Sequence, residues 1–198
     1  MLSKADNTRQ FIIEKAAPIF NTKGYAATSM NDILKATGLA KGGIYGNFKS
    51  KDEIAVEAFE YAYNQLKAAL IQKIKPLPTA SGQLLAILQF YKNYTIVPHI
   101  AGGCPLLNTA IDADDNIPFL KQKAAFALRE MLGSLEFIIQ KGINNGEFRN
   151  DLNAGKEAAI FFSIIEGGIM MSKVSDNPKI LNDLLENLKE QIMKRYIC

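Results

Sequence analysis

Residues 28–51, TSMNDILKATGLAKGGIYGNFKSK, contain two short helical patterns separated by a tight turn. Ser29 and Asp32 have the spacing of a capping box, so a helix is expected to begin here, with Thr28 as the alternative cap. Gly38 stands where a glycine in the left-handed conformation ends a helix. A second helix is expected to open three residues later. Two helices joined by a short glycine-containing turn form a helix-turn-helix unit.

The second helix has one side for the protein interior and one side free for a partner. Ile44 and Phe48 are four residues apart, so they share a face and can anchor the helix to the core. Tyr45 points away from that face. Gly42 and Gly43 each cost about 1 kcal/mol relative to alanine in a helix, and close approach to DNA is a reason to place them there. In helix-turn-helix units, the N-terminal part of the second helix approaches base edges.

Positive charge surrounds this second helix. Lys41 opens it, and Lys49 and Lys51 follow its end. The N-terminus of a helix also attracts phosphate groups. A glycine-containing turn taken alone is more typical of ordinary packed helices than of a DNA-binding unit. The residues that flank the turn make ordinary packed helices the weaker interpretation here.

The segment resembles the DNA-binding signature of the TetR (tetracycline-repressor-like) family of bacterial regulators. Nine positions agree with the signature in order and spacing: Thr28, Ile33, Gly38, Lys41, Gly42, Ile44, Tyr45, Phe48 and Lys51. Two positions depart from it. Asn47 stands where the family usually has histidine, and its amide can still donate a hydrogen bond to a phosphate. Ala40 stands where serine or threonine is common, and an alanine cannot cap the second helix.

The resemblance implies a double-stranded DNA partner and a set of contacts to it. Residues expected to approach bases and the adjacent backbone are Lys41, Gly42, Gly43 and Tyr45. Residues expected to hold phosphates are Thr28, Ser29, Asn47, Lys49 and Lys51. Two copies of the head would enter successive major grooves, about 34–36 Å apart, on a palindromic operator.

Composition and charge agree with this class of protein without requiring it. The 198 residues are 48% hydrophobic, enough for a substantial core, and carry a formal net charge of +3. Residues 1–75 hold 11 of the 23 Lys and Arg residues but 7 of the 20 Asp and Glu residues. This excess of positive charge fits a phosphate-binding head, and it equally fits an ordinary solvated surface.

The sequence predicts a soluble cytoplasmic protein. Cys104 and Cys198 lie far apart and suggest no disulfide framework, which favours a reducing compartment. The N-terminus has no apolar signal core. The most apolar stretch, 158–171, is too short to span a membrane and contains Ser163 and Glu166.

No motif for catalysis or cofactor binding stands out. One histidine and two distant cysteines give no zinc cluster, and no glycine-rich phosphate loop is present in the sequence. We therefore expect no metal, no cofactor and no enzymatic activity.

Hydrophobic periodicity predicts an all-α protein of about nine helices. Residues 1–48 are expected to form a three-helix DNA-binding head, in which the first helix covers 6–23 and ends at Gly24. Ser50 and Glu53 form a second capping box, which opens a linking helix over 50–75. Residues 49–198 are then expected to form a helical ligand-binding and dimerisation domain. Its remaining helices are expected at 83–97, 105–113, 118–143, 153–174 and 178–196.

The last two of these helices are the expected homodimer interface, because the family pairs its subunits there. The pair Gly167-Gly168 permits close helix approach, and the helix that contains it is too apolar to be solvated on all sides. The alternative is that 153–174 is the central core helix of a monomer.

The family's C-terminal domain typically holds a small-molecule effector. Aromatic and polar side chains on central helices are suited to line such a pocket: Tyr61, Phe90, Tyr94, Cys104, Asn108, Phe126, Phe162 and Glu166. Each of these residues also fits an ordinary core position. Glu166 is the most informative, because a carboxylate on an apolar helix needs a partner.

The sequence therefore predicts a transcription regulator, most simply a repressor released from its operator by a small molecule. One alternative is a helical small-molecule-binding protein or enzyme that keeps a vestigial head. Another is a redox sensor acting through Cys104, since a helix N-terminus favours the reactive thiolate. A cysteine that merely packs explains the same residue more simply.

Overall fold

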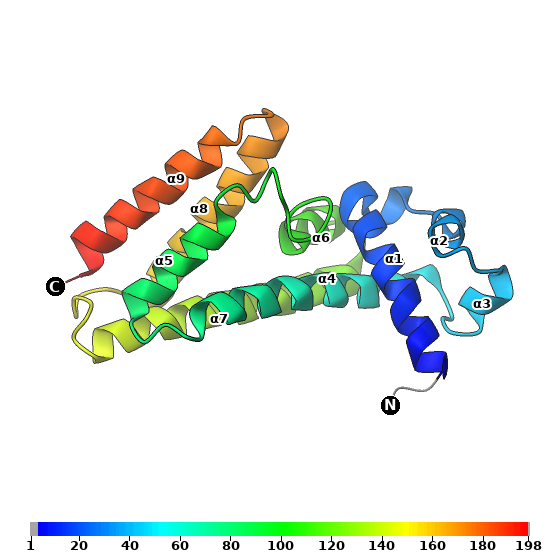
Figure 1. Ribbon diagram of the computed structural model, residues 1–198, viewed down its shortest axis with the longest axis horizontal. Coiled ribbons are helices and arrows are strands. Elements are labelled where there is room, and N and C mark those ends of the chain that lie inside the picture. Colours follow the sequence, from blue (N-terminus) through cyan, green and yellow to red (C-terminus); the bar gives the residue numbers. More distant parts are fainter. Residues whose placement is uncertain (1–3, 198) are drawn as a thin grey trace. The chain divides into compact units, whose positions relative to one another are not determined.

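The structure is a computed structural model that describes residues 4–197, shown in Figure 1. Within that range the regular secondary structure is helical apart from one isolated β-bridge, Phe148 to Ile197, which confirms the predicted all-α class. Nine α-helices and a final π-helical turn follow one another: α1 (Lys4–Ala27), α2 (Met30–Thr37), α3 (Lys41–Tyr45), α4 (Lys51–Ile74), α5 (Ala80–Tyr91), α6 (Pro105–Ala113), α7 (Pro118–Asn144), α8 (Ala154–Val174), α9 (Lys179–Gln191) and η1 (Ile192–Tyr196).

The helices pack into two compact units. Unit 1 extends up to Leu66 and includes Ile100–Phe126; unit 2 comprises Lys67–His99 and the chain from Ala127 onward. The packing thus does not follow the expected boundary between residues 48 and 49. Helix α6, expected in the second domain, packs on α1 within unit 1. The assignment of DNA binding to 1–48 and of ligand binding to 49–198 stays a prediction.

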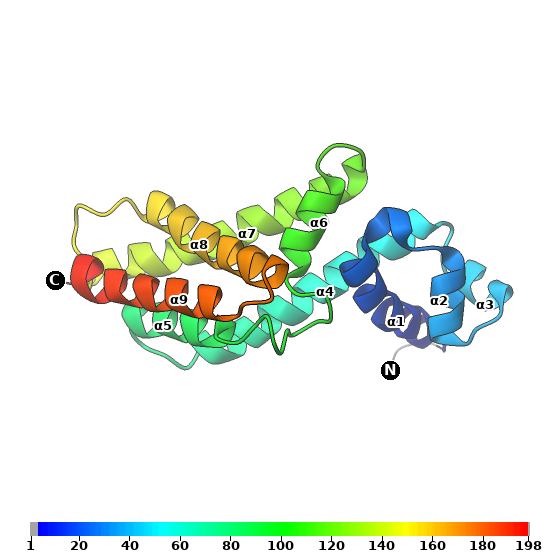
Figure 2. The same ribbon diagram turned by 90° about the horizontal axis from the view of Figure 1, so that it is seen from above.

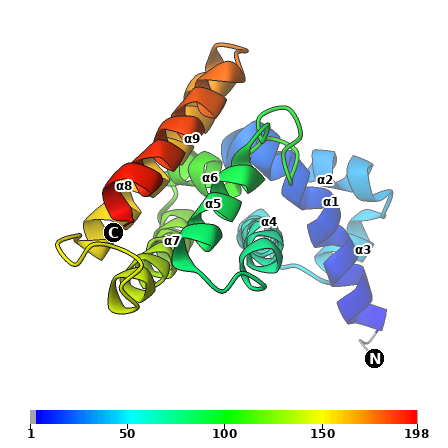
Figure 3. The same ribbon diagram turned by 60° about the vertical axis from the view of Figure 1, so that its left-hand side comes forward.

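The core of unit 1 joins α1, α2, α3 and the first turns of α4, and Figure 3 shows α1 in front of α2 and α3. Ile44 is fully buried and Phe48 is 2% exposed, so the predicted inward anchors of α3 are confirmed. The buried members of this core are Ile12, Ile13, Ala16, Ala17, Ile33, Ile44, Phe48, Ile54, Ala58 and Ala62. Residues near the start of α4 therefore take part in positioning α3.

Helix α5 begins earlier and ends earlier than the sequence predicted. It was expected over 83–97 and covers Ala80–Tyr91. The Thr79 side chain accepts a hydrogen bond from the Gly82 N–H, which starts the helix. Asn93 has a φ of 63°, a left-handed conformation that stops helical propagation. The apolar pattern continues past this point, which is why periodicity extended the helix too far.

In unit 2, α8 and α9 lie side by side, as Figures 1 and 2 show. A Cβ placed on Gly168 would stand 2.8 Å from the Leu181 side chain, so this glycine permits the close approach of the two helices within one chain. The Leu181 N–H also donates to the Ser172 hydroxyl at 2.9 Å. Regular α-helix ends at Gln191 rather than near Tyr196, and η1 completes the segment.

Candidate nucleic-acid interface

The first helix of the turn begins as predicted. The Ser29 hydroxyl accepts the Asp32 N–H at 3.2 Å, and the Asp32 carboxylate accepts the Ser29 N–H at 2.8 Å. The hydroxyl of Ser29 and then the ammonium of Lys23, 2.9 Å from the carboxylate, hold the pKa of Asp32 well below its usual range. At the other end, Gly38 has a φ of 68° and closes α2 with a hydrogen bond to Leu34.

The second helix of the turn, α3, is short and weakly started. It has five residues, and Ala40 supplies no side-chain cap, as the sequence predicted. The Gly43 N–H bonds to the Ala40 carbonyl at 2.9 Å. Because a single helical turn has too few hydrogen bonds to be stable alone, α3 depends on its neighbours for its placement.

The outward side of α3 carries three of the four residues predicted to approach bases. Tyr45 is 53% exposed, and Lys41 and Gly42 are also exposed. No other part of the described chain comes within 4 Å of the position that a Gly42 Cβ would occupy. Gly43 differs from the prediction, because its Cβ position lies 3.5 Å from Leu39 and faces the turn.

Two residues expected to hold phosphates bond to the protein's own backbone instead. Thr28 is 1% exposed, and its hydroxyl donates to the Gly24 carbonyl at 2.6 Å. The Lys51 ammonium donates to the Tyr25 and Thr28 carbonyls at 2.9 and 3.0 Å and lies 3.9 Å from the centre of the Tyr25 ring. These hydrogen bonds pair backbone carbonyls between Gly24 and Thr28 with the two side chains. They occupy the Thr28 hydroxyl donor and two of the three donors of the Lys51 ammonium.

The other three predicted phosphate contacts remain at or near the surface. Ser29 and Lys49 are exposed. Asn47 is half-buried, and its side-chain amide donates to the Gly43 carbonyl at 2.7 Å. A side-chain amide has two N–H donors, so this bond leaves one for another acceptor.

Tyr25 is a residue that the sequence reading passed over. Its ring stacks on Phe20 with 6.4 Å between centroids and meets Phe119 edge-on at 5.6 Å. Its hydroxyl donates to Asp52, and its backbone N–H donates to the Asp112 carboxylate at 2.6 Å. Burial, followed by the Asp52 hydrogen bond, raises the pKa of Tyr25 to about 12. Tyr25 thereby connects α1 to α4, α6 and the start of α7.

A second connection between α1 and α6 is a set of hydrogen bonds that we call the Asn21 network: Asn21, 101–103 and Asn108. The buried Asn21 amide donates to the Ala101 and Gly103 carbonyls at 2.8 and 3.0 Å. The Asn108 amide donates to the Asn21 backbone carbonyl at 3.0 Å and to the Gly102 carbonyl at 2.9 Å. Asn21 was not singled out from the sequence, because its partners lie about 80 residues away.

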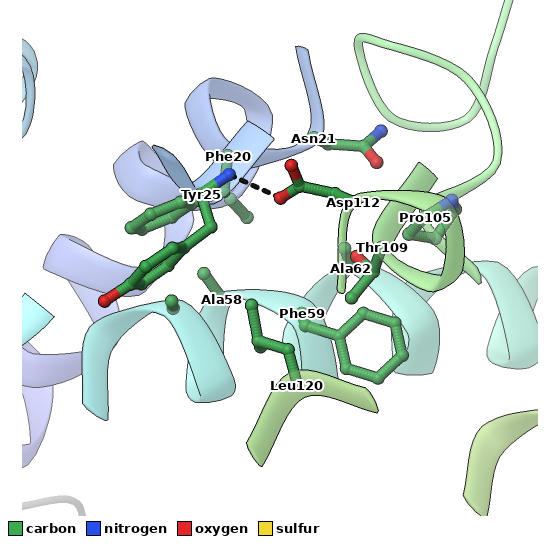
Figure 4. A pocket seen from close by; sticks show the side chains of 12 residues that line it. Phe20, Asn21, Tyr25, Ala58, Phe59, Ala62, Pro105, Thr109, Asp112 and Leu120 are labelled. Atoms are coloured by element: carbon green, nitrogen blue, oxygen red, sulfur yellow. Dashed lines mark hydrogen bonds between the residues drawn. The ribbon is translucent and has the colours of Figure 1, made fainter. Parts of the chain in front are cut away.

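A small cavity lies beside these contacts, between α1, α4, α6 and α7 (Figure 4). Figure 4 shows the Asp112 carboxylate directed at the Tyr25 N–H and Phe59 forming part of the wall. The cavity volume is about 20 Å³. This is room for a single water, far below the several hundred Å³ of a typical small-molecule site.

A larger groove of about 470 Å³ lies in unit 2 between α5 and α9. Its floor is apolar, with Leu85, Leu88 and Leu185, and its rim carries Lys92 and Lys189 among other polar residues. Neither this groove nor the small cavity is lined by any of the eight residues that the sequence suggested for an effector pocket.

Four of those eight residues lie in unit 1. Cys104 is 1% exposed at the start of α6, and Asn108 belongs to the Asn21 network. Tyr61 is half-buried, and burial raises its pKa. The Phe126 ring is 58% exposed, which is not the environment expected of a pocket wall. The burial of Cys104 also removes the exposure that a reactive sensor thiol needs.

The other four residues lie in unit 2. Tyr94, Phe162 and Glu166 are 2%, 6% and 9% exposed. Phe90 is half-buried and lies 6.1 Å from Tyr94, ring centre to ring centre. These positions fit core packing, and their role in ligand binding stays a prediction.

Helix α8 presents a stripe of small and apolar residues that are exposed, except for the half-buried Gly167. Its members recur at helical spacing and share one face: Ala159, Ser163, Gly167, Met170 and Val174. Met170 is 44% exposed and Val174 is 81% exposed. Nothing in the described chain comes within 4 Å of a Cβ placed on Gly167, in contrast to Gly168. The two adjacent glycines therefore face different surroundings.

The residues that the structure describes contain no cluster of three or more side chains able to hold a metal ion. None of the helices among these residues has the length and apolar character needed to cross a membrane.

Comparisons with known proteins agree with the geometry of the turn. A family model described as "Bacterial regulatory proteins, tetR family" matches residues 12–58, and one described as "Tetracyclin repressor-like, C-terminal domain" matches residues 80–188. A TetR-family transcriptional regulator from Cytophaga hutchinsonii is 39% identical, with a TM-score of 0.92 and coverage of 100% of this chain and 99% of that one.

Two other similar proteins extend this likeness. A TetR transcriptional regulator from Chloroflexus aurantiacus J-10-FL is 32% identical, with a TM-score of 0.94 and 99% of each chain covered. The "Fatty acid metabolism regulator protein" of Bacillus subtilis is 26% identical over 182 residues, which cover 89% of this chain and 91% of that protein. The similarity therefore extends well beyond the helix-turn-helix segment.

Proposed function

Because the chain belongs to the TetR family of bacterial regulatory proteins and is a DNA-binding transcription regulator, we propose that α3 reads its operator. Lys41, Gly42 and Tyr45 approach the base edges in the major groove. The observation that carries this assignment is that Ile44 of α3 and Phe48 just after it are buried, while the other side of α3 is exposed. The operator is a palindrome, because two identical heads read two half-sites.

The phosphate contacts come from a smaller set than the family signature alone implies. Ser29 is exposed at the start of α2, Lys49 is exposed after α3, and Asn47 retains one amide N–H for a phosphate oxygen. Such contacts set the position of the protein, while base contacts specify the sequence. A footprint on DNA upstream of the protein's own gene tests this function. A protein with a vestigial head would leave no footprint at any salt concentration.

Lys49→Ala and Lys51→Ala are expected to behave differently although both remove one positive charge. Lys49→Ala should weaken binding to any duplex and reduce the slope of log K against log salt by about 0.9, the value for one lost phosphate contact. Lys51→Ala should leave that slope unchanged and lower the melting temperature, because Lys51 bonds to the Tyr25 and Thr28 carbonyls. Fluorescence anisotropy titrations at several salt concentrations measure the slopes. Equal slope changes in the two variants would contradict the assignment.

The protein acts as a homodimer through α8 and α9. Support comes from the exposed stripe on α8, whose small residues Ala159, Ser163 and Gly167 permit close approach of a second helix. Met170 and Val174 supply apolar area at the end of the stripe. The symmetry of a dimer also matches the two half-sites of a palindrome.

Met170→Glu is expected to raise the dimer dissociation constant by about 100-fold or more. In a two-fold interface the new carboxylate would lose its water without gaining a partner. Sedimentation velocity across a concentration series measures the change. Gln140→Glu, which adds the same charge at an exposed position on α7, is the matched control and should leave the dimer intact. A Met170→Glu protein with wild-type dimerisation would place the interface elsewhere.

A small-molecule effector releases the repressor from DNA by binding the free conformation more tightly than the DNA-bound one. The match of the tetracycline-repressor-like C-terminal domain supports this part of the proposal. The similarity to a regulator of fatty acid metabolism makes fatty acids the first compounds to test. A compound that weakens the footprint at a concentration matching its own dissociation constant would identify the effector class.

A further inference from the structure

Arg9 on α1 lies at the centre of a group of residues that we call the Arg9 cluster: Arg9, Asn47, Phe48, Glu53 and Glu57. Its guanidinium donates to the Glu53 carboxylate at 2.6 Å and to the Glu57 carboxylate at 3.1 Å from Nε, with a further bond from Nη2 to Glu57. Nη1 donates to the Asn47 carbonyl. The guanidinium carbon lies 4.1 Å from the centre of the Phe48 ring.

These contacts leave Arg9 poorly suited to bind a DNA phosphate. A guanidinium has five N–H donors, and the four bonds to Glu53, Glu57 and Asn47 use four of them. Two carboxylates surround the single positive charge, so the cluster carries a net negative charge. A phosphate approaching Arg9 would meet that negative charge.

The same contacts hold the chain immediately after the recognition helix α3. Arg9 binds the carbonyl of Asn47, and the Asn47 side chain in turn bonds to the Gly43 carbonyl within α3 at 2.7 Å. Glu53 binds the Lys49 N–H at 2.7 Å, on the other side of Phe48. The backbone on both sides of the buried Phe48 is therefore connected to the Arg9 cluster.

The start of α3 lacks a comparable restraint. Ala40 provides no cap, and five residues make too few internal hydrogen bonds to fix a helix. The direction in which Lys41 and Tyr45 project is consequently set from the C-terminal end of α3, where the Arg9 cluster lies. Any conformational freedom that remains at the C-terminal end of α3 would have to be lost on operator binding. This loss of entropy would lower the operator affinity.

We propose that Arg9 is a positioning residue for operator recognition: it orients α3 through Asn47 and Phe48 and does not contact DNA. This inference rests on the proposed role of α3 in reading bases. It assigns a function to a basic residue of the DNA-binding head that differs from the phosphate contact its charge suggests. The planar fork of arginine, which serves two carboxylates and a carbonyl together, is the feature required at this position.

The test compares Arg9→Gln, Arg9→Lys and Lys49→Ala in the full-length protein. Anisotropy titrations use the footprinted operator and a scrambled duplex of equal length, from about 50 to 200 mM salt. Arg9→Gln should lower operator affinity by about tenfold. This is the loss expected when the backbone conformational entropy of about one residue must be lost on binding. It should leave the scrambled duplex and the salt slope of both duplexes nearly unchanged. Lys49→Ala should reduce the slope on both.

Arg9→Lys separates charge from geometry. It keeps the positive charge but supplies a point donor in place of the fork. Arg9→Gln should lower the logarithm of the association constant for the operator. We expect Arg9→Lys to show more than half of that decrease. Full recovery by lysine would show that charge alone matters and would overturn the proposal. A drop of about 0.9 in the salt slope for Arg9→Gln would do the same, because it would reveal a phosphate contact.

Glu57→Gln keeps the test decisive if an Arg9 variant folds poorly. It raises the net charge of the protein by one, which by itself favours DNA binding. Because it weakens the bond to Arg9, we expect the ratio of operator affinity to scrambled-duplex affinity to fall by about threefold. A ratio equal to or above the wild-type value would contradict the proposal.

Failure of the inference is distinguishable from failure of the proposed function. If Tyr45→Ala loses operator affinity while the Arg9 variants keep the wild-type ratio, α3 reads the operator and Arg9 does not position it. If Tyr45→Ala also keeps wild-type affinity, the base-reading role of α3 is wrong. Circular dichroism melts, with binding measured well below each midpoint, ensure that every comparison uses folded protein.

Discussion

Tyr45→Ala is expected to lower operator affinity by about 10- to 100-fold, corresponding to about 1–3 kcal/mol for one lost base contact. Tyr45 is 53% exposed on the outward side of α3, beside the exposed Lys41 and Gly42. Its ring is available for contact with base edges and sugars. Affinity for a scrambled duplex should change by less than about twofold, because non-specific binding depends on phosphate neutralisation.

Two controls define what the tyrosine contributes. Tyr45→Phe retains the ring and removes the hydroxyl, so it separates a hydrogen bond from an apolar contact. Phe11→Ala removes an exposed aromatic ring from α1 and should leave operator affinity unchanged. Equal losses on operator and scrambled DNA in Tyr45→Ala would remove Tyr45 from the base-reading set. The melting temperature should stay within about 2 °C of wild type, since exposed positions contribute little to stability.

Gly102→Ala is expected to lower the free energy of unfolding by about 2–4 kcal/mol, through backbone strain and a steric clash together. Gly102 has a φ of 98°, which an alanine adopts only with strain. A Cβ there would stand 2.5 Å from the Asn21 carbonyl oxygen, so the backbone of the Asn21 network must also shift. Urea denaturation at fixed protein concentration measures the loss. The expected result is a lower midpoint with an unchanged m-value.

Gly146→Ala is the matched control for this experiment. Gly146 also has a positive φ, 70°, but nothing in the described chain comes within 4 Å of its Cβ position. Its replacement should cost about 1 kcal/mol through backbone strain alone. The difference between the two variants measures the steric part. Equal losses of unfolding free energy in the two variants would mean that residues 101–103 and α1 move apart at no cost when the Cβ is added.

Local features of the turn could be predicted from the sequence. The capping box of Ser29 and Asp32 involves residues three apart, and the shared face of Ile44 and Phe48 involves residues four apart. Gly38 at the end of α2 follows the same short-range rule. Such interactions depend on the chain a few residues away, which the sequence displays directly.

Features that depend on distant partners could not be predicted in this way. Thr28 and Lys51 match the family signature, but their side chains bond to backbone carbonyls between Gly24 and Thr28. Arg9 interacts with residues 38 to 48 positions away, and Asn21 with residues about 80 positions away. Nothing within a few residues of these positions indicates those partners.

The residues that line an effector pocket also could not be predicted from hydrophobic periodicity. Periodicity identified residues on the inner faces of helices, and Tyr94, Phe162 and Glu166 are indeed buried. It does not tell whether an inner face lines a void or packs against a neighbour. Phe126, chosen by the same reasoning, is 58% exposed. Cavity walls depend on the detailed fit of several helices, which periodicity does not encode.

The two-sided character of α3 has a consequence for how such regulators diversify. The buried residues that hold the helix in place, Ile44 and Phe48, are separate from the exposed residues that we propose contact DNA, Lys41 and Tyr45. Mutations at the exposed positions can therefore alter the recognised sequence with little penalty in folding. A library randomised only at Lys41, Gly42 and Tyr45 should yield mostly folded proteins with new operators. After gene duplication, this arrangement lets two copies acquire separate target genes without first losing stability.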